Sequence, residues 1–189
     1  MKLRILKNLI LCLKSDQKSK NQNPSFQKFD FSNNSFLKIL LKALIQGFKL
    51  SKDQNNESNM INESIGSNLL DIMMVLKFII KKNENNIYLI DIINFSVGIL
   101  KNNAGDQNFR SKLLEKCNIE TVCYYFHFFH DVDFSNKNQE EEKKEKTLDE
   151  IRNSKILSIY INITCLFRNL AVQSECIQKY LETEVNIIL

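Results

Sequence analysis

Apolar residues recur every three or four positions in five long stretches of the chain, which is the spacing of one face of an α-helix. The pattern predicts long helices at 35–50, 67–82, 87–103, 119–132 and 153–171. A shorter amphipathic stretch, 109–116, predicts one more helix. Ser35 is the expected N-cap of the first helix, and Ser67 or Asn68 that of the second, because their side chains accept hydrogen bonds from the first free backbone N–H groups.

Polar segments separate these stretches and divide the chain. Residues 1–34 are expected to hold a short basic amphipathic helix followed by a polar linker, and residues 35–189 one helical domain. The first helix fits a packing helix, with a mitochondrial presequence or a membrane-surface helix as alternatives. A charged insert at about 133–150 is expected to be either a solvated helix or a disordered loop, outside the core in both cases.

Composition supports an all-α domain. Of 189 residues, 43% are hydrophobic, and the chain has only four Gly and one Pro, so it contains few helix breakers. The net charge of +4 is mild and spread along the chain, which gives no strong nucleic-acid signal. Five cysteines without a CxxC pair suit reduced thiols and a cytoplasmic location. No uninterrupted apolar run reaches the length of a transmembrane helix.

Part of the sequence occurs twice. Residues 101–119, "KNNAGDQNFRSKLLEKCNI", align without gaps with residues 168–186, "RNLAVQSECIQKYLETEVN", at a constant shift of 67 residues. In each copy, a long helix ends in a tight turn and a short helix follows. The shift exceeds the usual helical-repeat period of about 40–47 residues, and the charged insert accounts for most of the excess.

"FRNLAVQSECIQKYLETEVNIIL" resembles the armadillo repeat, in which a long helix ends at an asparagine-containing corner and a short helix opens the next repeat. "LKNNAGDQNFRSKLLEKCNIETV" resembles it too, with Asn103 where Leu is usual. Within armadillo-like proteins the chain is most similar to the ataxin-ten group. The resemblance implies a right-handed armadillo/HEAT-like solenoid that acts as a protein-binding scaffold or adaptor in cytoskeletal, ciliary or signalling assemblies.

The same resemblance implies a binding surface. In armadillo proteins the corner asparagine lies on the inner helix and hydrogen-bonds the backbone of an extended peptide, which places Asn102 and Asn169 in that role, with Lys101 and Arg168 beside them. A structural role competes with this interpretation, because such an asparagine also satisfies backbone groups where a helix ends. The chain has no Trp, the residue that accompanies this asparagine in nuclear-signal-binding armadillo proteins.

One cluster raises the question of a metal. One predicted helix carries three possible ligands on neighbouring turns: Cys123, His127 and His130, or Asp131 in place of the last. An open zinc site has three protein ligands. The same residues fit an aromatic packing helix, so the expected answer is no metal and no cofactor. A Gly-rich phosphate loop and nucleophile signatures are missing from the sequence, which predicts a non-enzyme.

Three functions therefore stand as hypotheses: a protein-binding scaffold first, then a helical subunit embedded in a larger complex, then a helical nucleic-acid binder. The last residues, "NIIL", fall early in what would be another helix of the repeat. That position predicts either a fragment of a longer protein or an end covered by another chain, because solenoids normally close with a polar outer face.

Overall fold

The computed structural model describes residues 34–52, 65–116, 119–135 and 143–172. Within this part of the chain every regular element is a helix, so the predicted all-α class is confirmed. The predicted N-terminal helix lies outside the described residues, as do nearly all of the linker and the second copy of the repeated segment from residue 173 onward.

The six helices that the hydrophobic pattern predicts between residues 35 and 171 are all present, and their ends differ by a few residues. Their bounds are α2, Asn34–Ser51; α4, Ile65–Ile80; α5, Ile87–Asn103; α6, Gln107–Lys116; α7, Ile119–Ser135; and α8, Lys143–Ala171. The capping predictions were wrong: Ser35 lies inside α2, and Ser67 and Asn68 lie inside α4. The last eight residues of the charged insert belong to α8, so that part is helical, and Asp149 and Glu150 are exposed as expected of a solvated helix.

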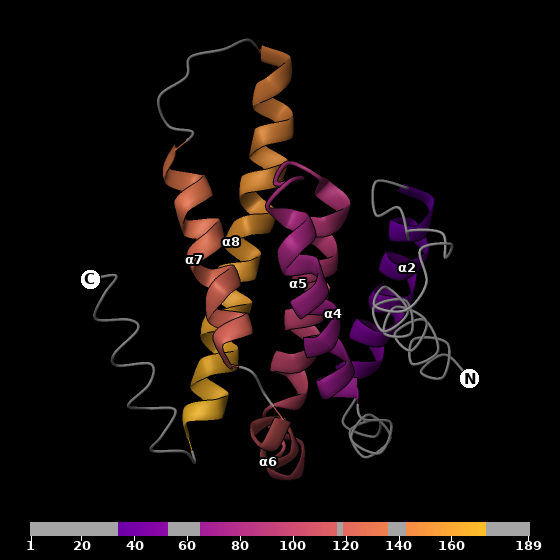
Figure 1. The fold of residues 1–189 in the computed structure, drawn as a ribbon, viewed down its shortest axis with the longest axis vertical. Coiled ribbons are helices and arrows are strands. Elements are labelled where there is room, and N and C mark those ends of the chain that lie inside the picture. Colours follow the sequence, from indigo (N-terminus) through magenta and orange to yellow (C-terminus); the bar gives the residue numbers. More distant parts are fainter. Residues whose placement is uncertain (1–33, 53–64, 117–118, 136–142, 173–189) are drawn as a thin grey trace, which may run out of the picture.

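Three of the helices, α2, α5 and α8, lie side by side and run in the same direction (Figure 1). On one side of α5, Tyr88 lies under Lys38 near the start of both helices, and Asn102 bonds Ser51 near their ends. On the other side, Asp91 pairs with Lys155, and the carbonyl of Lys101 accepts from Asn169. We call these three parallel helices the first layer; α5 is its centre.

A second layer consists of α4 and α7, which run opposite to the first layer (Figure 1). α4 packs against α5 and α7, and α7 packs against α8. Tyr125 joins the two helices of this layer, because its buried hydroxyl donates to the carbonyl oxygen of Met73. Burial raises the pKa of Tyr125 well above its usual value, and the charge of neighbouring Tyr124 raises it further.

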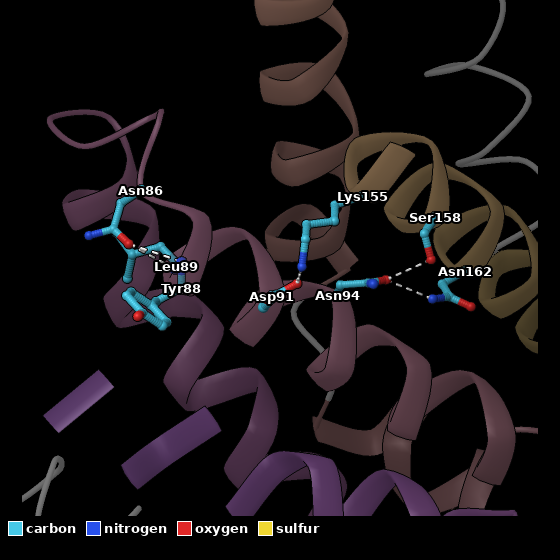
Figure 2. Close-up of polar contacts among 8 residues, drawn as sticks. All are labelled: Asn86, Tyr88, Leu89, Asp91, Asn94, Lys155, Ser158 and Asn162. Atoms are coloured by element: carbon cyan, nitrogen blue, oxygen red, sulfur yellow. Dashed lines mark hydrogen bonds and ion pairs between the residues drawn. The ribbon is translucent and has the colours of Figure 1, made fainter. Parts of the chain in front are cut away.

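Local capping fixes where α5 begins and where α6 begins. Asn86 has an extended backbone (φ −74°, ψ 105°), and its Oδ1 accepts from the backbone N–H groups of Tyr88 at 3.0 Å and Leu89 at 3.4 Å (Figure 2). Asp106 does the same for α6, accepting from the N–H of Phe109 at 2.7 Å. Side-chain acceptors therefore satisfy free N–H groups at both helix starts.

The core lies between the two layers, and α5 contributes heavily to it. Ten residues of α5 are buried, including Gly98 and Asn103. Gly98 permits close packing with α2: a Cβ atom at this position would lie 2.7 Å from Cε2 of Phe48. The ring of Phe48 therefore packs directly over the backbone of α5, edge-on to Phe95 with the ring centroids 5.4 Å apart.

Candidate functional site

Polar side chains line the contact between α5 and α8, in the middle of the first layer. Asp91 and Lys155 form an ion pair. One turn further on, Oδ1 of Asn94 accepts from Ser158 Oγ at 3.2 Å and from Asn162 Nδ2 at 2.9 Å (Figure 2). We call this contact the polar seam and define it by seven residues: Asp91, Asn94 and Lys101 of α5, and Lys155, Ser158, Asn162 and Asn169 of α8.

The polar seam continues to the ends of both helices. Lys101 Nζ donates to Oδ1 of Asn162 at 2.8 Å, and Asn169 Nδ2 donates to the carbonyl of Lys101 at 3.3 Å. The amide of Asn162 thus bridges Asn94 and Lys101, using both its donor and its acceptor. Because each member holds a neighbour on the facing helix, the seam ties about three turns of α5 to about four turns of α8.

The corner beyond the polar seam is held by Arg110 of α6. Its Nη1 lies 3.3 Å from the carbonyl oxygen of Ala104, just after α5, and 3.3 Å from that of Asn169, near the end of α8. Arg110 is buried. A cation is favourable here because the carbonyl ends of helices carry partial negative charge. One side chain of α6 therefore joins the ends of α5 and α8.

The structure brings together two of the four residues predicted to bind a partner, Lys101 and Asn169. Lys101 and Asn169 belong to the polar seam, and Asn102 lies on the other side of α5, where its Nδ2 donates to Ser51 Oγ at 3.0 Å. These three side chains are half-buried, whereas Arg168 is exposed. Each asparagine amide is anchored through its nitrogen.

These anchoring bonds show how the asparagines serve the fold. Asn169 bonds the backbone of the neighbouring helix, while Asn103, the residue found where Leu was expected, donates to the carbonyl of Ile99 in its own helix at 2.8 Å. A structural contribution of Asn169 thus exists alongside any binding role, since its Oδ1 remains an acceptor on a half-buried side chain.

The metal candidates are placed only in part. Cys123 is a buried thiol and His127 is half-buried beside the ring of Phe126. The side chains of His130 and Asp131 are not among those described, so the three-ligand alternative is not tested. Within the described residues, no group of three His, Cys, Asp or Glu side chains is placed to hold a metal ion.

Sequence reasoning missed most of the polar seam. Asp91, Asn94, Lys155 and Asn162 stand inside apolar runs that were assigned to packing helices. A signal was present: Asn94 and Asn162 are 68 residues apart, close to the shift of 67 that relates the two repeated segments. The shift of 67 aligns Asn94 with Ile161, one residue before Asn162, so this signal indicates the level of the contact along the two helices and not the bonded pair.

The electrostatics of the polar seam are positive. Lys155 neutralises Asp91, and Lys101 bonds a neutral amide, so its charge is not compensated by these contacts. Arg168 adds an exposed cation on α8, close to Asn169 in sequence. The seam presents amides at fixed positions together with cations, a combination that suits hydrogen bonding to a polypeptide and pairing with its carboxylates.

Comparison with known proteins gave no match: no family model, curated protein or solved structure is similar to the chain. The armadillo resemblance therefore stays a prediction. None of the helices in the described ranges is both long and apolar enough to cross a membrane.

Proposed function

We propose that the chain is a non-catalytic protein-binding scaffold with an armadillo-like right-handed solenoid fold, working in the cytoplasm. The observation that carries the proposal is the parallel packing of α2, α5 and α8. Hydrogen-bonded and ion-paired residues of α5 and α8 are 61 to 68 residues apart, close to the sequence shift of 67. Stacked repeats bring equivalent helices together in this way.

The proposed binding surface comprises the polar seam with Asn102 and Arg168. Asn102 and Asn169 hold fixed positions because their nitrogens are already bonded, and their Oδ1 atoms would accept from the N–H groups of a partner segment. Lys101 and Arg168 would pair with its acidic side chains. Fixing the amides in advance lowers the conformational entropy lost on binding.

The test compares three proteins in affinity capture with cross-linking. The first is wild type, and the second carries Asn102→Ala, Arg168→Ala and Asn169→Ala. The matched control carries Lys82→Ala, Glu84→Ala and Asn85→Ala, three exposed residues in the turn before α5. Circular dichroism and melting are recorded for each protein.

The proposal predicts partners that wild type and control share and that a folded triple variant loses. The same partners on all three folded proteins would contradict the assignment of the binding surface to the polar seam. If the triple variant unfolds, Lys101→Glu in otherwise wild-type protein tests the same surface through its charge.

A subunit embedded in a larger complex is the second candidate. It is favoured by Leu157 and Ile161 on α8, whose side chains are 59% and 55% exposed. Their neighbouring positions on one helix face form a small apolar surface that an adjoining subunit would cover. Purified protein that aggregates, and that becomes soluble only with its neighbours, would favour this candidate over a scaffold that is soluble by itself.

A nucleic-acid binder is the third candidate, and one helix favours it. Lys38, Lys42, Lys49 and Lys52 follow one exposed face along α2 and the residue after it, and residues 34–52 contain no Asp or Glu. Retention on a polyanion resin at physiological salt, lost on Lys42→Glu with Lys49→Glu, would support this candidate, because phosphate contacts are salt-dependent.

A further inference from the structure

α8 carries a stripe of exposed residues on its outer side. Successive members are alternately four and three residues apart, the spacing that keeps a row of side chains on one helix face. Every member is exposed, and the two central ones are the apolar Leu157 and Ile161. We call this row the outer stripe; it consists of Glu150, Ser154, Leu157, Ile161, Thr164 and Arg168.

The outer stripe is distinct from the surfaces that α8 already uses. Lys155, Ser158 and Asn162 face α5 in the polar seam. The buried positions Ile156, Ile159, Ile163, Leu166 and Leu170 face the core. The outer stripe therefore leaves both the polar seam and the core undisturbed when another helix packs on it.

The order of residues along the outer stripe is self-complementary. When the stripe is laid antiparallel against a copy of itself, an acid faces a base, a hydroxyl faces a hydroxyl and an apolar residue faces an apolar residue. Glu150 and Arg168 are equidistant from residue 159, as are Ser154 and Thr164, and as are Leu157 and Ile161.

We propose that the outer stripe is a homodimer interface in which α8 of one copy packs antiparallel against α8 of a second copy. A two-fold axis near residue 159 would place Leu157 against Ile161 of the other copy and Glu150 against its Arg168. Both pairs form twice, as an isologous interface requires.

The charges favour a second copy of α8 as the partner helix, and an antiparallel over a parallel orientation. An antiparallel second copy meets opposite charges at both ends of the outer stripe. A parallel copy would place Glu150 beside Glu150 and Arg168 beside Arg168, which is repulsive. The first helix of another copy, α2, offers lysines on its exposed face rather than a matching apolar pair.

The size of the contact predicts a weak dimer. The outer stripe runs over 19 residues of α8, about 27 Å at 1.5 Å per residue. One pair of helices in contact over that length lies toward the small end of specific interfaces. The dimer is therefore expected to dissociate on dilution. This inference does not rest on the proposed function, because it concerns purified protein and a row of side chains that shares only Arg168 with the proposed binding surface.

Sedimentation velocity over a dilution series of the full chain tests the proposal. Wild type is expected to shift from dimer to monomer on dilution. Leu157→Asp should abolish the dimer, because each copy would place a carboxylate against Ile161 of the other. Ile39→Asp on α2 is the matched control, an equally exposed isoleucine outside the outer stripe, and should leave the dimer unchanged.

Charge reversal tests the antiparallel pairing itself. Glu150→Arg alone and Arg168→Glu alone each create two repulsive pairs and should weaken self-association roughly tenfold. Mixing the two variants restores both attractive pairs, so the mixture should form heterodimers about as well as wild type. Monomeric wild type at every concentration would overturn the proposal, and so would a mixture that associates no better than either variant alone.

Discussion

The two sides of α5 are packed in different ways. Toward α2 the contact is apolar and close at its centre, with the ring of Phe48 lying over Gly98 and against Phe95, and one side-chain hydrogen bond, from Asn102 to Ser51, lies at its end. Toward α8 the contact is the polar seam, in which side chains hydrogen-bond across from one helix to the other. The helices lie parallel on both sides, so the difference lies in the side chains and not in the arrangement.

The two sides of α5 therefore contribute to the fold in different ways. Apolar burial against α2 supplies stabilising free energy without depending on the identity of each atom. The polar seam contributes less net free energy, because its groups lose hydration in forming it. Its bonds are satisfied in one axial register of α5 and α8, so the seam specifies how far one helix is shifted along the other.

The largest expected effect is on the α2 side. Gly98→Val should destabilise the fold by about 3 kcal/mol, because the added carbon atoms collide with the ring of Phe48. Chemical denaturation measures the change. Gly105→Val is the control, since nothing lies within 4 Å of a Cβ at that position. Equal losses in the two variants would show that Phe48 does not pack closely over Gly98.

A smaller effect is expected in the polar seam. Asn94→Ala removes the acceptor of two hydrogen bonds and leaves the nitrogen of buried Asn162 without its partner. The expected loss is about 2 kcal/mol of unfolding free energy. Asn153→Ala, at an exposed position of α8, should change little. A loss of unfolding free energy no larger than that of this control would show that Asn94 does not make the hydrogen bonds of the seam.

The ion pair of the seam should contribute less again. A double-mutant cycle with Asp91→Asn and Lys155→Met should give a coupling free energy of about 1 kcal/mol, because the pair is partly exposed, with 17% and 28% of the two side chains accessible. The coupling should shrink at high salt. Strict additivity of the two substitutions would mean that the pair does not act across the seam.

Ionisation of Tyr125 at alkaline pH should destabilise the contact between α4 and α7 in the second layer, where Tyr125 lies, and should not act on the polar seam of the first layer. The raised pKa of Tyr125 means that its stabilising contribution is complete below the unfolded tyrosine pKa of about 10 and is lost as pH rises through the folded pKa. At neutral pH no change is expected from this titration. Melting measured from pH 8 to 11 should decline less steeply in Tyr125→Phe than in wild type or Asn94→Ala; identical slopes would contradict the prediction.

The sequence predicted the helices well because their burial follows a simple period. α5 is the clearest case: its apolar residues and Asn86 before them mark its start, and the turn at 104–106 marks its end. The start of α8 was missed, because the Glu-Lys run is compatible with a helix and with a loop, and helical propensity alone does not decide between them.

The candidate site was predictable only at its ends. Lys101, Asn102 and Asn169 stand at helix termini, where the repeated segment draws attention to them. Asn94 and Asn162 are visible as polar residues in apolar runs, but that they bond each other depends on α5 and α8 being parallel and in register. The role of Arg110 depends on two chain segments meeting at one corner, which no local pattern encodes.

The parallel first layer has a consequence for how the chain folds as it is made. The hydrogen bonds named between α2 and α5, and between α5 and α8, join residues at most 68 positions apart. Phe48, Phe95 and Gly98 all precede α6, so α2 and α5 hold every group of their apolar contact before α8 is synthesised. In the first layer, each parallel helix therefore packs against one that is synthesised before it, α5 against α2 and α8 against α5.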